Sequence, residues 1–166
     1  MQHTVEGKTL TLERTFSAPR QKVWDAFTKP ELFVKWWGPR GWVTEVKEFN
    51  FTEGGTNHYG MKCDDPKQKD WYGKYSWGKM VFSNINPIDS FNYQDYFCDE
   101  NAVVQEGMAV ATVVQEFIEV EGGTKIVSTG IYESEEALKQ VVEMGMLPGI
   151  AETWDRLEEL VADRRN

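Results

Sequence analysis

Cysteine is scarce in this sequence of 166 residues, and long apolar segments and an apolar N-terminus are lacking. Its two cysteines, Cys63 and Cys98, are too few for a disulfide framework, so we expect two reduced thiols in a cytoplasmic protein. No segment approaches the roughly 20 apolar residues of a membrane span. Residues 1–14 are polar and carry no apolar signal-peptide core, so no secretory signal is expected.

Basic charge is also scarce, because the formal net charge is −9. Nucleic-acid binders usually present a basic stripe, whereas the basic clusters here are limited to Lys67 with Lys69 and Arg164 with Arg165. Nucleic acid and anionic membranes are therefore poor partners. The two histidines, His3 and His58, are far apart in the sequence, and a zinc site needs three or four converging ligands. We expect no metal and no cofactor.

Aromatic residues are abundant, with seven Trp, six Tyr and nine Phe. Such side chains supply apolar area with a polar tip, which suits both a packed core and a ligand cavity. The chain has no internal repeat and no Pro- or Ser-rich linker, so we predict one domain over residues 8–164, preceded by an N-terminal arm of residues 1–7.

Alternating apolar residues predict a first strand at 9–16, followed by two short helices. Ser17 is the expected cap of the first helix, with Pro19 in its first turn, and Gly38-Pro39 ends the second. Trp36 and Trp37 lie 100° apart on that helix. We predict that one of them is buried and that the other borders a pocket or the edge of the core.

Between residues 42 and 132 the apolar pattern changes to a period of two, interrupted by turn signals. Short turns between successive strands predict an antiparallel meander. The predicted strands span residues 43–51, 56–63, 71–82, 91–97, 108–120 and 125–132.

The C-terminal segment has helical periodicity that begins after a capping residue, Ser134. Gly145 and Pro148-Gly149 predict a break or kink in this helix. Beyond the break, we predict that one apolar stripe faces the concave side of the sheet, with the acidic residues mostly off it. The stripe is Ile150, Trp154, Leu157 and Val161, and the acids are Glu152, Asp155, Glu158 and Glu159.

The sequence resembles the START-like helix-grip superfamily, and more closely the prokaryotic relatives of the activator of heat-shock-protein-90 ATPase. Trp36-Trp37-Gly38-Pro39 is the most specific motif of the resemblance, which covers roughly residues 9–162. The other matching motifs are Ser17-Ala18-Pro19-Arg20, Gly54-Gly55, Trp71-Tyr72-Gly73-Lys74-Tyr75, Gly122-Gly123-Thr124 and Gly145-Met146. Gly149-Ile150, where many relatives carry Gly-Trp, and the polar insertion 64–70 depart from the pattern.

The resemblance implies an α+β helix-grip fold. Its curved antiparallel sheet of six to seven strands would wrap around a long C-terminal helix, with two short helices after the first strand. An apolar cavity between sheet and helix would bind a small hydrophobic or amphipathic ligand such as a lipid. The candidate lining residues are Trp37, Tyr59, Trp71, Tyr75, Phe97, Ile150 and Trp154. A filled core built from the same aromatics is the alternative.

Two further functions remain open at this stage. The resemblance allows a chaperone co-factor role in the stress response, although the eukaryotic activator has an extra N-terminal domain and this sequence has eight residues before its first predicted strand. A cyclase or hydratase would need an inward acid or base, and no local signature of one is present. The residues to inspect are His58, Glu45, Glu48 and Glu133; His58 alternates with polar neighbours and is expected on the solvent side or in a hydrogen bond.

Overall fold

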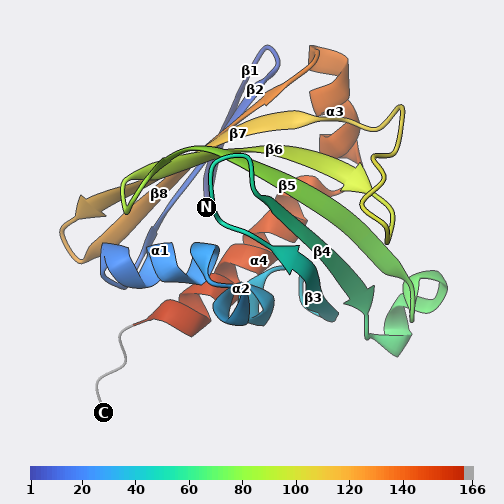
Figure 1. The fold of residues 1–166 in the computed structure, drawn as a ribbon, viewed down its shortest axis with the longest axis horizontal. Coiled ribbons are helices and arrows are strands. Elements are labelled where there is room, and N and C mark those ends of the chain that lie inside the picture. The colour runs from blue at the N-terminus through green and yellow to red at the C-terminus, as the bar shows by residue number, and fades with distance from the viewer. Residues whose placement is uncertain (163–166) are drawn as a thin grey trace.

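Eight antiparallel strands form one curved sheet in the computed structural model, which describes residues 1–162 (Figure 1). The order across the sheet is β1-β2-β8-β7-β6-β5-β4-β3, so β1 and β3 are its edges. The strands are β1 Gln2–Glu6, β2 Thr9–Phe16, β3 Trp42–Phe49, β4 Thr56–Cys63, β5 Tyr75–Asn86, β6 Ser90–Cys98, β7 Ala111–Val120 and β8 Gly123–Tyr132. The predicted α+β class and meander are confirmed, with one strand more than the six to seven expected.

The additional strand is β1, which corrects the prediction that residues 1–7 form an arm outside the domain. β1 pairs with β2 from Gln2 opposite Glu13 to Glu6 opposite Thr9. All five of its side chains are exposed, so the strand lacks the apolar alternation by which it could have been recognised. Its backbone hydrogen bonds and the tight turn at Gly7 (φ +59°) hold it instead.

Two short helices follow β2, as predicted: α1 Arg20–Thr28 and α2 Pro30–Trp36. The expected cap was wrong, because α1 is preceded by Pro19 and has no side-chain cap. The backbone N–H of Ser17 instead donates to the carboxylate of Glu158 at 3.1 Å, which ties the start of this segment to the last helix.

The tryptophan pair at the end of α2 behaves as predicted. Trp36 is fully buried and donates from Nε1 to the carbonyl of Ala26 at 2.8 Å. Trp37 follows the helix, is half-buried, and stacks on Phe33 with ring centroids 5.0 Å apart. The chain then turns at Gly38 and enters β3, so the two neighbouring indoles face different surroundings.

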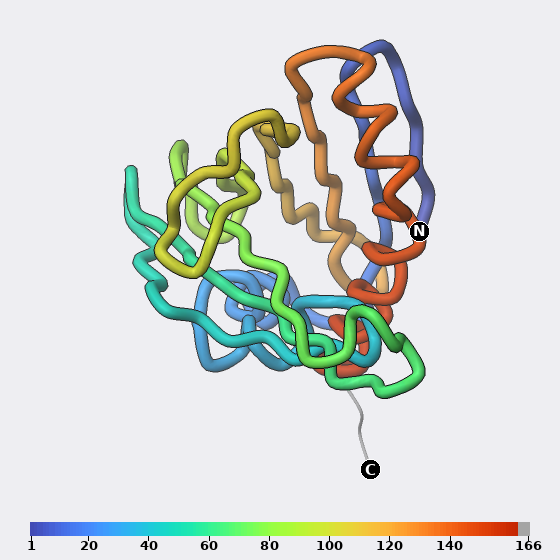
Figure 2. Tube along the Cα trace, turned by 90° about the vertical axis from the view of Figure 1, so that its right-hand side faces the viewer, coloured from blue at the N-terminus to red at the C-terminus, as the bar shows by residue number. Residues whose placement is uncertain are grey.

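The C-terminal helical region is broken at Gly145, as predicted, but the break also predicted at Pro148-Gly149 was wrong, because both residues lie in the first turn of the last helix, where a proline is tolerated. The helix α3, Glu135–Glu143, is capped by Ser134 Oγ, which accepts from the N–H of Ala137 at 3.0 Å. Gly145 takes a left-handed conformation (φ +89°), and α4, Met146–Val161, continues in a new direction under the sheet (Figures 1 and 2). The apolar stripe of α4 is buried, except that Ile150 is partly accessible, and its acids lie mostly at the surface.

One half of the space beneath the sheet is filled by an aromatic core between α1 and the sheet. Its members are Trp24, Phe27, Phe51, Phe82, Phe91 and Phe117. Edge-to-face contacts dominate, for example Trp24 with Phe117 at 5.1 Å and Phe51 with Phe82 at 4.9 Å. Such pairs favour a single well-ordered arrangement. This aromatic core fixes α1 and α2 against the sheet.

Candidate functional site

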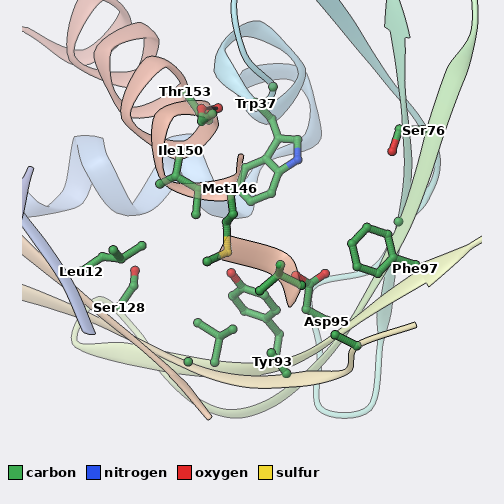
Figure 3. Close-up of a pocket in the computed structure, with 18 of the residues that line it drawn as sticks. Leu12, Trp37, Ser76, Tyr93, Asp95, Phe97, Ser128, Met146, Ile150 and Thr153 are labelled. Carbon is green, nitrogen blue, oxygen red and sulfur yellow. Dashed lines mark hydrogen bonds between the residues drawn. The ribbon is translucent and has the colours of Figure 1, made fainter. Parts of the chain in front are cut away.

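The other half of the space beneath the sheet contains a cavity of about 390 Å³. Its walls come from the concave face of β2 and β4–β8, from the turn after α2, and from α3 and α4 (Figure 3). Most of the lining side chains are apolar or aromatic, including Leu12, Val113 and Met146. A cavity of this size and polarity is typical of sites for small ligands.

Five of the seven predicted lining residues border this cavity. Trp37 and Ile150 lie on one side of it and Phe97 on another (Figure 3). Tyr59 and Trp154 are buried in its wall. Trp154 also packs edge-to-face on Phe16 with ring centroids 5.8 Å apart, so it belongs to both the cavity and the core.

Trp71 and Tyr75 do not line the cavity, so these two predictions were wrong. The predicted strand 71–82 begins only at Tyr75, because the polar insertion folds into η1, Pro66–Trp71, a short 3₁₀ segment. Trp71 lies at its end and is exposed. Gly78 pairs with the inward Tyr59, so Tyr75 points to the opposite face, where it stacks on Trp77 at 5.1 Å.

Asp95 is the one residue with a charged side chain among the described residues that line the cavity. β6 places Tyr93, Asp95 and Phe97 on the same face, and all three point inward (Figure 3). The ion pairs within residues 1–162 do not include Asp95. The carboxyl group therefore faces an apolar space without a cationic partner.

Burial raises the pKa of Asp95 to about 7, because the ionised form loses its hydration in this cavity. The neighbouring phenols are affected in turn. Burial, and then the negative charge of Asp95, raise the pKa of Tyr93 well above its usual value and that of Tyr132 to about 12. The cavity thus holds one carboxyl group that titrates near neutral pH among hydroxyls that remain protonated.

Gln115 supplies a second polar feature of the wall. Its Oε1 accepts from Ser128 Oγ at 2.6 Å, and its buried Nε2 has no partner. Gln115 is only 2% exposed and borders the cavity. An unpaired buried amide donor costs free energy unless a ligand or water satisfies it.

Sequence reasoning missed Asp95, although a signal was present. In the predicted strand 91–97, Phe91, Tyr93 and Phe97 share one face by alternation, and Asp95 necessarily lies on that face too. A lone acid within an apolar stripe is unusual enough to mark a site. Gln115 lies on the same face as Val113 and Phe117 of β7 and offers the same kind of signal.

The four residues singled out as possible acids or bases all lie outside the cavity. Glu45, Glu48 and Glu133 are exposed. His58 faces away from the cavity, as its alternation predicted, and it makes a hydrogen bond, because Nε2 lies 3.0 Å from the carbonyl of Asp99. It is nevertheless buried beneath the loop 99–104 rather than facing solvent.

Arg156 holds the tryptophan side of the cavity in place. Its guanidinium extends from α4 and donates to the carbonyl of Gly38 at 2.7 Å and to that of Lys35 at 3.2 Å. These bonds fasten the turn that presents Trp37 to the same helix that presents Ile150 and Trp154. Two walls of the cavity are therefore linked.

Within residues 1–162, no cluster of three or more metal-binding side chains is present. Over the same stretch, no helix is long and apolar enough to cross a membrane.

A curved antiparallel sheet that grips a C-terminal helix over a cavity defines an α+β domain with the SRPBCC-type fold. The family model for "Activator of Hsp90 ATPase homolog 1-like protein" matches residues 17–162, and the chain belongs to that family. No curated protein matches the sequence significantly.

Solved structures agree with this assignment. Protein Ms6760 from Mycobacterium smegmatis is 28% identical, with 99% of this chain and 97% of that chain covered and a TM-score of 0.85. A protein from Staphylococcus epidermidis is 30% identical, with 100% and 96% covered and a TM-score of 0.82. The AHSA1 protein from Silicibacter pomeroyi, at 16% identity, 93% and 97% coverage and a TM-score of 0.69, shares the fold.

Proposed function

We propose that this protein binds a small apolar or amphipathic molecule in the cavity between the sheet and α4. The observation that carries the proposal is the cavity itself, about 390 Å³ of space with a mainly apolar wall. Natural cores are packed to near-crystalline density, so an apolar space of this size costs stability unless it serves a ligand.

The methionines at the break between α3 and α4 support ligand entry at this point. Met144, Gly145 and Met146 all border the cavity. Methionine side chains are flexible and adapt to different apolar shapes, and the glycine joins two helices that meet at an angle. This part of the wall can adjust to a ligand more easily than the strands can.

Fluorescence titration with the neutral probe N-phenyl-1-naphthylamine tests the proposal. Wild-type protein should bind it with saturable enhancement. Ala111→Phe should abolish binding, because Ala111 is buried in the cavity wall. Ile118→Phe is the matched control, since Ile118 lies on the same strand but is exposed on the other face. Absence of saturable binding to the wild type, or equal binding by both variants, contradicts the proposal.

Asp95 favours acid–base catalysis as a second candidate function. A carboxyl group with a pKa near 7 in a mainly apolar cavity can donate or accept a proton at physiological pH. A cyclase- or hydratase-type enzyme would use it on a ligand bound beside Tyr93 and Phe97. Mass spectrometry of a bound ligand after incubation distinguishes binding from catalysis. An unchanged ligand mass supports binding alone. A changed mass with the wild type, but not with Asp95→Asn, supports an enzyme.

A protein-interaction role, including a chaperone co-factor role, is the third candidate. It is favoured by three exposed aromatics outside the cavity, Trp71, Tyr72 and Tyr75. Stimulation of a heat-shock-protein-90 ATPase by wild-type protein, lost in Trp71→Ala and retained in Ala111→Phe, would support it. No stimulation by the wild type would count against it.

A further inference from the structure

The cavity has one strongly asymmetric feature, a single carboxyl group in an otherwise uncharged wall. Of the described lining residues, Asp95 alone carries a charged side chain, and no Lys, Arg or His borders the space. Folding buries such a carboxylate at considerable cost, which a purely apolar ligand would not offset. An alanine or a leucine at this position would line the cavity at lower cost.

We propose that the ligand of this cavity is an amphipathic amine, whose ammonium group pairs with the carboxylate of Asp95 while its apolar body fills the rest of the space. This inference rests on the proposed function and names the chemical class of its ligand. A charge-assisted hydrogen bond of this kind is strong where water is excluded.

The surroundings of Asp95 suit an ammonium group better than an anion. Electron-rich rings of Tyr59, Tyr93 and Trp37 border the same space, and a desolvated cation is attracted to the faces of such rings. The net charge of −9 also favours the approach of cations over anions.

The other titratable groups around Asp95 do not compete for its charge. They are the phenols of Tyr59, Tyr93, Tyr96 and Tyr132 and the thiol of Cys98. Burial raises the pKa of Tyr59, Tyr93, Tyr132 and Cys98, so these four groups are neutral at pH 7. The sheet and α4 therefore supply no cation to the carboxylate. A cationic ligand would be its first ionic partner.

The unpartnered amide of Gln115 is a second polar position in the wall, where a polar group of a ligand or a water molecule would gain a hydrogen bond. Gln115 lies four residues along β7 from Ala111, which pairs with Asp95. At 3.3 Å per residue the two polar positions are about 13 Å apart along the sheet. A ligand held at Asp95 by its amine would place its distal end near Gln115.

Three ten-carbon probes test the inference by isothermal titration calorimetry at pH 8, each below its aggregation concentration: decylamine, 1-decanol and decanoate. We expect decylamine to bind the wild type about 10-fold more tightly than 1-decanol, and decanoate to bind more weakly than either. Asp95→Asn should lower the affinity for decylamine about 10-fold and leave that for 1-decanol unchanged. Asp70→Asn, an exposed site, controls for the loss of one charge and should change neither.

A proton-linkage measurement gives a readout that general attraction of cations would not produce. Because the amine requires ionised Asp95, its affinity should fall about 10-fold per pH unit below pH 7, and binding at pH 6 should release close to one proton. Asp95→Asn should bind decylamine without this release.

The outcomes separate the inference from the function on which it rests. If 1-decanol and decylamine bind equally, or if Asp95→Asn leaves decylamine affinity unchanged, the amine assignment is overturned while ligand binding stands. Preference for decanoate overturns it as well. If none of the three probes binds the wild type, both the assignment and the proposed function are contradicted.

Discussion

The two halves of the space beneath the sheet use the same residue types for different purposes. On the side of α1, the aromatic core packs mostly edge-to-face and leaves little room, with Phe91 and Phe117 almost wholly buried. On the side of α4, Trp37, Tyr59 and Phe97 leave an open cavity. Aromatic content alone therefore does not indicate whether a region is core or site.

What differs between the halves is polarity on the inward face of shared strands. β6 contributes Phe91 to the aromatic core but Tyr93 and Asp95 to the cavity, and β7 contributes Phe117 to the core but Gln115 and Ala111 to the cavity. The large Phe91 and Phe117 are thus followed, toward the cavity, by the small or polar Asp95, Ala111 and Gln115, while Phe97 at the far end of β6 is again aromatic and lines the cavity. The change in polarity and size marks the boundary between core and cavity.

The tryptophan pair provides the largest test of this contrast, because neighbouring residues of the same type fall in different halves. Trp36→Ala should lower the free energy of unfolding by about 3–5 kcal/mol, since it removes a fully buried indole and its bond to Ala26. Trp37→Ala should cost about 1–2 kcal/mol, because part of its surface already faces the cavity. Urea denaturation measures both.

Equal losses in the two variants would mean that the cavity half is as tightly packed as the aromatic core. A similar slope of unfolding free energy against urea in both variants is the control, because it shows that neither substitution alters the surface exposed on unfolding.

The pH dependence of stability sharpens the comparison at Asp95. Its pKa is about 7 in the folded protein and close to 4 when unfolded, so the folded state binds more protons between these values. Its contribution to stability therefore falls as the pH rises from about 4 to 7. Asp95→Asn should remove this loss and stabilise the ligand-free protein at pH 8 by up to about 4 kcal/mol.

Thermal denaturation from pH 4 to pH 8 provides the measurement. Asp89→Asn is a suitable control, because Asp89 is an exposed carboxylate paired with Arg20 and should not reproduce the effect. If the difference in melting temperature between the wild type and Asp95→Asn stays constant from pH 4 to pH 8, Asp95 is well solvated in the folded protein.

Much of this architecture was predictable, because period and turn chemistry are local properties. The strand 9–16, the break at Gly145 and the buried stripe of α4 all follow from short patterns. β1 could not be predicted in this way, because it is held by backbone pairing alone. The outward position of Tyr75 could not be predicted either, because it depends on the register that η1 imposes on β5. The cavity itself depends on how far the sheet curves from α4, which no local pattern records.

The smallest expected change in stability, and the last test of the contrast, comes from adding the same side chain to each half. Ala111→Leu places three more carbons beside the cavity, where there is space, and should leave the free energy of unfolding unchanged or raise it by about 1 kcal/mol. Ala26→Leu adds the same atoms to the buried face of α1 and should cost about 1–3 kcal/mol, because a packed core has no room for them. Chemical denaturation of the two variants side by side measures the difference. If Ala111→Leu lowers the free energy of unfolding as much as Ala26→Leu does, the cavity wall closes in the free protein. If neither substitution lowers it, the aromatic core is looser than its ring contacts indicate.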